Sequence, residues 1–529
     1  MERRFILPGL LAATLLAGAL RLASLGSVPV ALYCDESFSG YEAWCLLHTA
    51  RDSRGVLLPF FFDIFGKGWG EPLYIYLTVP AVGLLGLTPF AARLVAALAG
   101  TLAVAATGLM TAALLKRDLG AVRAARAGVC AAALMAISPW AFHLSRIAFQ
   151  ASLLPLALAA GFWLAARALS HPEEPRPRML AAGAALLGLS LYTYTIARLA
   201  MPLLVAGFAW LHRKRLRSPL PAAIVLAALI VPIAAFSLTE RGRQRFSDVS
   251  ILTMRTSRGA PDAGTLQKAG VAWSHYLSYY TPRFLLAEGD PNLRHSIRGH
   301  GTLHPHDVAL LLVGAASCLL LRTPGSRFAL WWLAVYPAAA ALTVDPRHAV
   351  RAICGLPGIY MIEGMGAAAI WSALARRAGP GWRRVTATAL ATAMVAVSGL
   401  TVARYFHDYF VDYPAYSGPA WQYGLKEVYQ ITEPALGDRQ AHDSVYVTRY
   451  EDHPYSQYLF YQAVPPGEYQ TYHLSRRPYI FGHDRWEPGP GRERPIFVWK
   501  PEEVPDSDAV EVRHVIKYPD GSDAFVIAW

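Results

Sequence analysis

Asparagine is almost missing from this chain of 529 residues: Asn292 is its single copy, and Leu and Arg follow it. The chain therefore contains no Asn-x-Ser/Thr sequon, which excludes N-glycosylation. Charged residues are also few, at 16% of the sequence, which is unusual for a soluble protein. Hydrophobic residues make up 54%, so the composition is typical of a polytopic membrane protein.

Cysteine is scarce too, and the five cysteines are too few and too dispersed to form a disulfide framework. Cys130, Cys318 and Cys354 lie in apolar segments, where a free thiol packs as a small hydrophobic group. Cys34 and Cys45 share one loop, so the sequence leaves a disulfide between these two open.

The net charge of +12 does not indicate a nucleic-acid partner. Lys and Arg fall in short clusters between apolar runs, which is how the loops of membrane proteins are marked. Residues 5–25 form the first apolar run, and no small-residue cleavage motif stands between it and Asp35. We therefore expect a retained first span rather than a removed signal peptide.

Twelve apolar runs could enter a bilayer, and the basic residues between them indicate which runs cross it. If residues 72–92 lie in the outer interface, five loops with sixteen Lys and Arg all face the cytoplasm; if that run spans, the same loops face outward. Pro72 and Pro80 also fit a short interfacial helix. The eleven expected spans are residues 5–25, 94–115, 127–142, 147–166, 179–197, 199–211, 220–238, 307–321, 328–344, 352–375 and 385–403.

The predicted fold is thus a polytopic α-helical membrane protein of about eleven spans plus interfacial helices, located in the cell membrane with its amino terminus in the cytoplasm. Residues 1–403 form the transmembrane domain, with a first outer loop at 26–92 and a long outer loop at 239–306. Because the long loops all face outward, we expect the function on that face.

Residues 404–529 are predicted to form a small extracytoplasmic α/β domain. The turn at Asp520 and Gly521 joins its last two strands into a hairpin. Its strands are expected at 445–448, 495–499, 512–518 and 524–529, and its helices at 419–431 and 454–463.

An acidic pair, Asp35 and Glu36, shares the outer loops with a surplus of arginines. Arginine binds phosphate oxygens through a planar fork that always carries charge. A carboxylate can accept the proton of an attacking hydroxyl or amine. Together, at the level of the bilayer surface, these groups suit the transfer of a group from a lipid phosphate.

Ten short motifs in fixed order carry a resemblance that covers nearly the whole chain. They are Cys34–Tyr41, Glu71–Tyr76, Ala92–Leu94, Ser138–Trp140, Ser145–Phe149, Tyr192–Tyr194, Ala197–Leu199, Gly289–His295, His348–Arg351 and Leu356–Pro357. With this set the chain resembles the bacterial lipid-linked-sugar glycosyltransferases of the C superfamily, in the branch of the protein O-mannosyltransferases and the aminoarabinose transferase of lipid A.

The resemblance implies a polyprenyl-phosphate-linked sugar as donor, with its lipid between helices and its phosphate at the outer surface. Asp35 matches the first-loop acid that acts as general base, with Glu36 beside it, and direct displacement would invert the anomeric carbon. The arginines expected at the donor phosphate are Arg93, Arg146, Arg198 and Arg351. The substrate pocket is expected to contain Glu71, Tyr74, Gln150, Tyr192, Tyr194, Arg294 and His348.

Two positions depart from the pattern of this family. Many relatives have an acidic residue where this chain has Gln150, and many have lysine where it has Glu71. Without the second acid, a tightly held divalent metal is less favoured, so no cofactor is expected to be required. No motif specifies whether the acceptor is a protein, a lipid or a glycan.

A possible metal site and an alternative function rest on two further features of the sequence. Five histidines of the long outer loop, at 275, 295, 300, 304 and 306, suggest a metal site, although their spacing matches no compact motif. Glu363 lies within an expected span, and an intramembrane carboxylate favours a secondary transporter or lipid flippase as the alternative function. A membrane-anchored binding protein would not need the acid and the arginines.

Overall fold

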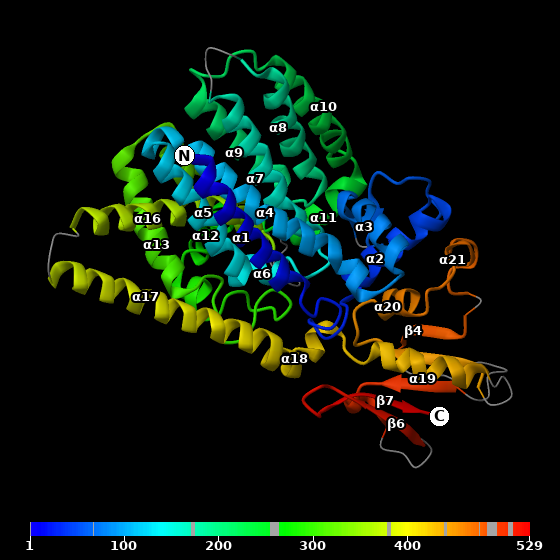
Figure 1. The fold of residues 1–529 in the computed structure, drawn as a ribbon. Helices are drawn as coiled ribbons and strands as arrows, with labels where there is room; N and C mark the ends of the chain where they lie inside the picture. The colour runs from blue at the N-terminus through cyan, green and yellow to red at the C-terminus, as the bar shows by residue number, and fades with distance from the viewer. Residues whose placement is uncertain are drawn as a thin grey trace.

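The structure is a computed structural model that describes residues 2–66, 68–170, 175–253, 264–377, 382–437, 442–475, 477–483, 495–505 and 511–529. Helices make up most of the chain as far as residue 407, and a sheet follows within the last 90 residues. Figure 1 shows the amino terminus at one end of the helical part and the sheet beyond its other end.

A helix overlaps each of the eleven apolar runs expected to span, although several bounds differ, most of all at 328–344. These helices are α1 (Glu2–Leu22), α4 (Pro89–Leu119), α5 (Ala121–Ile137), α7 (Leu154–Ala168), α8 (Pro177–Leu189), α9 (Ala197–His212), α10 (Leu220–Ser237), α13 (Pro305–Leu321), α14 (Pro324–Val335), α16 (Leu356–Arg377) and α17 (Trp382–His407). Among the described residues, four helical stretches are both long and apolar enough to cross a bilayer: Pro89–Leu119, Gln150–Ala168, Leu220–Ser237 and Ile353–Leu374. The class predicted from composition, a helical membrane protein, is confirmed at this level.

Small residues let the helices approach closely, as in other membrane bundles. A Cβ added to Gly314 of α13 would lie 1.9 Å from the carbonyl oxygen of Ile362 in α16. A Cβ on Gly128 of α5 would lie 2.4 Å from the carbonyl oxygen of Gly108 in α4. Larger side chains at these glycines would therefore push the paired helices apart.

The expected interfacial segment contains the short helix α3 (Leu73–Leu85). This helix has 13 residues and packs against α2 (Cys34–Thr49) and the start of α4. α2 carries both Cys34 and Cys45, which are buried and unpaired. The disulfide that the sequence left open does not form, because the two cysteines lie eleven positions apart on one rigid helix.

The long outer loop contains its own helical segments. These are α11 (Glu240–Val249), α12 (Thr265–Ser278) and η3 (Arg283–Ala287). Five more short helices lie between the long ones and position loops of the site described below. They are α6 (Pro139–Leu144), η1 (Gln150–Leu153), η2 (Ser190–Tyr192), α15 (Ala338–Ala341) and η4 (Ile353–Gly355).

A five-stranded sheet with the order β4-β3-β5-β7-β6 lies near the carboxyl terminus. β3 runs parallel to β4 and β5, whereas β7 runs antiparallel to β5 and β6. The four predicted strands and the final hairpin are present: β3 (Ser444–Thr448), β5 (Pro495–Trp499), β6 (Val512–Lys517) and β7 (Asp523–Ala528). The sequence analysis missed β4 (Tyr479–His483), which has a glycine with a φ of +83° at position 482.

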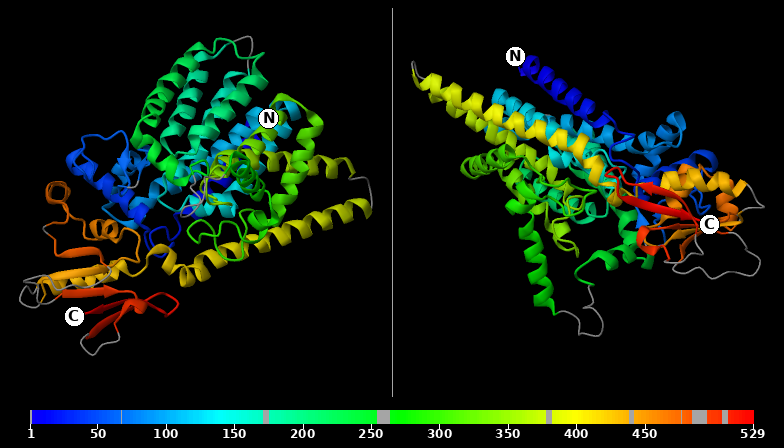
Figure 2. Two further views of the ribbon diagram at one scale, coloured as in Figure 1. Left: turned by 180° about the vertical axis from the view of Figure 1, so that it is seen from behind. Right: turned by 90° about the horizontal axis from the view of Figure 1, so that it is seen from below.

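Helix α17 and several shorter helices connect the bundle to this sheet, as both views of Figure 2 show. The connecting helices are η5 (Asp408–Asp412), α18 (Tyr413–Tyr416), η6 (Gly418–Trp421) and α19 (Leu425–Gly437), whereas α20 (Pro454–Tyr461) and α21 (Pro466–Tyr472) lie between β3 and β4. α20 packs against α2, so the carboxyl-terminal segment returns to the first outer loop.

Candidate active site

The acidic pair opens helix α2, and the first turn of this helix sends its two carboxylates to different surroundings. Asp35 is partly exposed and lines a cleft, whereas Glu36 is fully buried. Successive residues of an α-helix are about 100° apart around its axis, so one side chain can face a cleft while the next packs inward.

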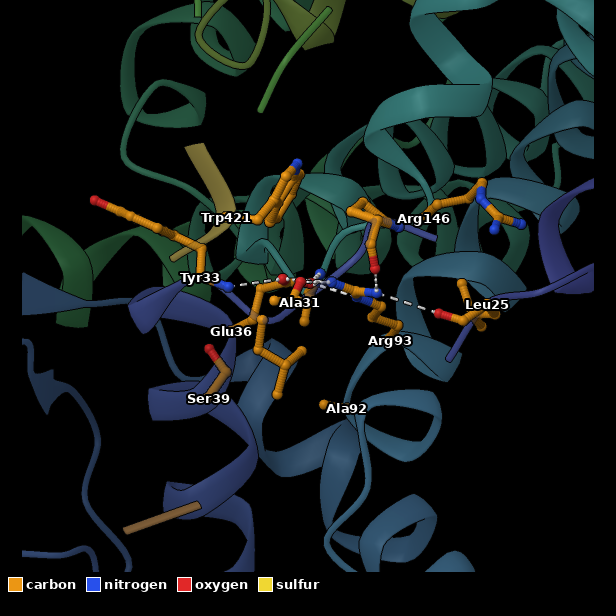
Figure 3. Close-up of polar contacts among 12 residues, drawn as sticks. Leu25, Ala31, Tyr33, Glu36, Ser39, Ala92, Arg93, Arg146 and Trp421 are labelled. Atoms are coloured by element: carbon orange, nitrogen blue, oxygen red, sulfur yellow. Dashed lines mark hydrogen bonds and ion pairs between the residues drawn. The ribbon is translucent and has the colours of Figure 1, made fainter. Parts of the chain in front are cut away.

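Glu36 forms a buried ion pair with Arg93 (Figure 3). Nε and Nη2 of Arg93 donate to the two Glu36 oxygens at 2.8 and 2.9 Å. The same carboxylate accepts the backbone N–H of Tyr33 at 3.2 Å and that of Ala148 at 2.9 Å. These four bonds occupy both oxygens of Glu36, and neither Glu36, expected to be catalytic, nor Arg93, expected at the donor phosphate, lines the cleft of Asp35.

Arg93 and Arg146 together hold the connection between α1 and α2. Arg93 donates to the carbonyl oxygens of residues 25, 29 and 31 at 3.3, 2.9 and 2.5 Å. Arg146 donates to those of residues 20, 21 and 28 at 3.0, 2.8 and 2.8 Å. Both side chains are 0% exposed, and Arg146, expected at the donor phosphate, does not line the cleft of Asp35 either.

The carboxyl-terminal segment braces the start of α2 from the other side. The side chain of Gln422 accepts the backbone N–H of Cys34 at 2.9 Å. Gln457 donates to the Leu32 carbonyl oxygen at 2.8 Å, and the Tyr33 hydroxyl donates to Asp452 at 3.0 Å. The residues just before Asp35 are therefore fixed by parts of the chain 388 to 425 positions away.

Asp35 lines a cleft of about 360 Å³. Six of the thirteen residues predicted for the site line this cleft: Asp35, Gln150, Tyr194, Arg294, His348 and Arg351. They come from five outer segments, and more than 300 positions separate the first residue, Asp35, from the last, Arg351. The structure thus brings one carboxylate of the pair and two arginines to a common hollow.

Arg351 and Arg294 are the two basic side chains of the cleft that always carry charge. Nη2 of Arg351 donates to Asp345 at 2.9 Å, while its buried Nη1 has no hydrogen-bond partner among the described residues. The guanidinium of Arg294 lies 3.8 Å from the ring centre of Tyr33 and donates to the Ala420 carbonyl oxygen at 3.2 Å. The spare donors of Arg351 can therefore accommodate an anionic oxygen.

Glu71 and Arg198 form an ion pair beside the cleft rather than within its lining. Nη2 of Arg198 donates to Glu71 at 3.1 Å, and the Thr195 hydroxyl donates to the same oxygen at 2.7 Å. Thr195 itself lines the cleft. Glu71 is 2% exposed, so it neutralises Arg198 instead of contacting a substrate.

Tyr74 and Tyr192, which were expected in the substrate pocket, do not line the cleft. Tyr74 is fully buried, and its hydroxyl donates to the Ala92 carbonyl oxygen at 2.7 Å. The hydroxyl of Tyr192 donates to the carbonyl oxygen of Leu229 at 2.8 Å. Each hydroxyl is used to hold two segments together.

Asp290 organises the loop that presents Arg294. Its oxygens accept the backbone N–H groups of Asn292 at 2.8 Å and Ala349 at 2.7 Å, and Nδ1 of His295 lies 2.9 Å from Oδ2. Burial alone would raise the pKa of Asp290, but the charge and the hydrogen bond of His295 outweigh it and lower that pKa to about 2. Asp290 is therefore ionised, and it ties the 289–295 loop to the turn that carries His348.

Asp290, His295 and His348 could hold a divalent cation, because their ligand atoms lie within 4.8 Å of one another. Of the five loop histidines, only His295 belongs to this described group. The others have separate contacts: His275 with the Thr343 carbonyl, His300 with Asp408, and His304 with the Ile137 carbonyl and the ring of His306.

Polar residues that line the cleft but were not predicted for the site include Tyr33, Asn292 and Asp345. A signal was present for each of them. Tyr33 directly precedes the acidic pair, Asn292 is the single asparagine of the chain, and Asp345 stands six positions before Arg351.

Glu363, on which the transporter reading depends, does not line the cleft. It is fully buried within α16, and its oxygens have no hydrogen-bond partner among the described residues. The cleft and this carboxylate are therefore separate features of the molecule.

No protein-family model and no curated protein matches the chain. Solved structures do match. ArnT from Cupriavidus metallidurans, in the apo state and bound to undecaprenyl phosphate, is 14% identical, with a TM-score of 0.52 over 98% of this chain and 97% of that one. The Archaeoglobus fulgidus oligosaccharyltransferase in the apo form is 12% identical, with a TM-score of 0.53 over 94% of this chain and 69% of its own. The chain therefore has the fold of the C-superfamily glycosyltransferases, which confirms, at the level of the fold, the resemblance carried by its motifs.

Proposed function

We propose that the protein is an integral membrane glycosyltransferase that moves a sugar from a polyprenyl-phosphate-linked donor to a hydroxyl or amine of an acceptor. The observation that carries the proposal is the cleft that joins Asp35 with Arg294 and Arg351. The structural neighbours support it: ArnT was solved with undecaprenyl phosphate, and the oligosaccharyltransferase AglB with dolichol-phosphate and an inhibitory peptide.

Asp35 is the general base of the proposed reaction. The acceptor atom attacks the anomeric carbon of the sugar, the bond between that carbon and the phosphate oxygen breaks, and the acceptor proton passes to Asp35. The electron pair leaves with the polyprenyl phosphate. One displacement at the anomeric carbon inverts its configuration.

The arginines of the cleft stabilise the leaving phosphate. Charge accumulates on its oxygens as the bond breaks, so fixed cationic donors are most useful at that point. Arg351 has a donor to spare, and Arg294 is held against Tyr33. Gln150, Tyr194 and His348 line the same hollow and would contact the sugar or the acceptor.

No divalent metal is required in this proposal. The oxygens of Asp290, the one carboxylate of the possible metal group, already accept the N–H groups of Asn292 and Ala349 and lie against His295. These contacts give Asp290 a structural use without an ion. If a cation were bound there, Asp290, His295 and His348 would be its ligands, and it would add positive charge near the phosphate.

The cleft belongs to the outer face in this proposal, and the amino terminus to the cytoplasm. The basic residues assign four loops to the cytoplasm, and these loops meet around two hollows that are separate from this cleft. The loop residues that line the two hollows fall within 116–121, 175–176, 212–217 and 324–325. Their convergence agrees with four loops on one side of the bilayer, which both span counts require, and the positive charge of these loops favours the cytoplasmic side and therefore eleven spans. Residues 404–529 then form the extracytoplasmic domain, and the bilayer holds the lipid of the donor.

The decisive experiment compares the two carboxylates that line the cleft. The variants Asp35→Asn and Asp345→Asn would be expressed in a strain that lacks the gene, and its glycans and lipid-linked sugars analysed by mass spectrometry. Loss of a general base costs about 10²- to 10⁴-fold, so Asp35→Asn should lose the product and accumulate the donor. Asp345→Asn should retain most transfer.

Both variants should fold normally, which size-exclusion chromatography of the purified proteins would check. Retained transfer in Asp35→Asn, together with its loss in Asp345→Asn, would move the base to Asp345. A glycan and lipid-linked sugar profile unchanged by deletion of the gene would overturn the proposed function itself and leave the transporter or flippase as the better candidate.

A further inference from the structure

A second hollow lies apart from the active-site cleft and shares no lining residue with it. Its volume is about 260 Å³, and it lies where helices α4, α7 and α9 end and where α5 and α14 begin. A smaller hollow adjoins it and shares Leu169 and Arg215 with it. We call the two together the basic hollow.

Basic side chains dominate this hollow. Its described charged residues are Lys116, Arg117, Arg176, Arg215 and Arg217 against a single carboxylate, Asp118. Asp118 is engaged at the start of α14, where it accepts the backbone N–H of Ser326 at 2.9 Å. It therefore neutralises only part of the positive charge.

Arg117 and Arg215 repel each other across the hollow. Burial and then the charge of Arg117 lower the pKa of Arg215, against the opposing effect of Asp118. An anion bound between two guanidinium groups that repel each other forms charge-assisted hydrogen bonds with both and offsets their repulsion. Snorkelling to the membrane surface would account for exposed arginines, but Arg215 is partly buried and lines both hollows.

Apart from Ser170 and His212, the remaining lining is apolar. Ala113, Leu114, Ala121, Ala166 and Leu169 line the hollow next to the basic groups. This combination suits a ligand with an anionic head and hydrocarbon beside it. Basic pockets between helices on the cytoplasmic side are a recognised place for the head groups of anionic lipids.

We propose that the basic hollow binds the phosphate of an anionic phospholipid from the cytoplasmic leaflet, with Arg117 and Arg215 as its principal ligands. The assignment to that leaflet rests on the proposed membrane orientation. The site is separate from the transfer reaction, because none of its residues lines the cleft of Asp35.

Lipid binding by the full-length protein tests this proposal. The protein would be purified in detergent, freed of lipid and titrated with phosphatidylglycerol, phosphatidylcholine or inorganic phosphate, with native mass spectrometry to count bound molecules. The variant Arg117→Gln/Arg215→Gln removes both ligands. The matched control Arg213→Gln/Lys214→Gln removes two exposed charges of the same turn that line neither hollow.

We expect the wild type and the control to bind phosphatidylglycerol in preference to phosphatidylcholine, and the arginine variant to bind it about tenfold or more weakly. A variant with both arginines replaced by lysine keeps the charge and should retain most binding, which guards against misfolding of the glutamine variant. Equal losses in the variant and the control would overturn the proposal. So would inorganic phosphate that binds as tightly as phosphatidylglycerol, since the site would then serve a small anion.

Discussion

Replacing Glu36 by glutamine distinguishes a structural acid from a catalytic one. Glu36→Gln keeps the shape of the side chain but leaves the guanidinium of Arg93 buried without its counter-charge. Breaking a buried pair in this way costs about 3–5 kcal/mol, because the remaining charge cannot be solvated. The pair is 0% exposed on both sides, so screening by solvent does not reduce this figure.

We expect Glu36→Gln to reduce the stability of the fold, and to affect transfer only through that loss of stability. We expect a markedly lower apparent melting temperature for Glu36→Gln in detergent than for Asp35→Asn, whose side chain is partly exposed. Thermal unfolding and transfer activity would be measured on the same preparations. A Glu36→Gln protein with an unchanged melting temperature and no transfer would refute the structural role and restore Glu36 as a catalytic group.

Three further predictions follow from individual side chains. Arg351→Gln should lower kcat/KM for transfer by about 100-fold through loss of a phosphate donor, whereas Arg347→Gln, an arginine of the same turn outside the cleft lining, should retain activity within a few fold. Treatment with EDTA should leave transfer within about twofold of the untreated enzyme; a loss restored by Mn²⁺ or Mg²⁺ would make Asp290 a metal ligand instead. Burial raises the pKa of Glu42 to about 7 against the lowering effect of its bonds to Ser53, so the folded protein favours the protonated acid. The protonated Glu42 side chain contributes its full stability below the ordinary pKa near 4.5, and this contribution is lost as the pH rises through 7. The variant Glu42→Gln should therefore raise the melting temperature at pH 8 and leave it nearly unchanged at pH 4. An equal change at both values would show that Glu42 does not titrate in this range.

Hydrophobic runs and basic loops were sufficient to predict the helical part of the fold. A bilayer-crossing helix needs an uninterrupted apolar stretch, and such a stretch can be recognised from neighbouring residues alone. The short helix at 73–85 was predicted from Pro72 and Pro80 and from the charge of the loops that follow, which together favour an interfacial helix over a span. The strand at 479–483 was missed because it is short and contains a glycine, so it has little strand signal of its own.

The functional residues were predicted less evenly, and the difference has a physical cause. A sequence shows that an arginine lies near the membrane surface, but not whether its guanidinium faces a cleft or the backbone of a neighbouring loop. Arg351 and Arg93 both follow short turns at the same membrane face, yet one is in the cleft and the other binds three carbonyl groups. Only the packing of distant segments decides between these outcomes.

The contacts of Gln422, Gln457 and Asp452 with residues 32–34 bear on how this protein can be recombined. A chimera that exchanges everything after residue 403 for the equivalent part of another protein of this fold would separate these side chains from the loop they support. The exchanged unit must then include residues 26–49 as well, so that the loop and its support come from the same parent. The boundary visible in composition, at residue 403, is therefore not a boundary at which the two parts of this protein can be exchanged.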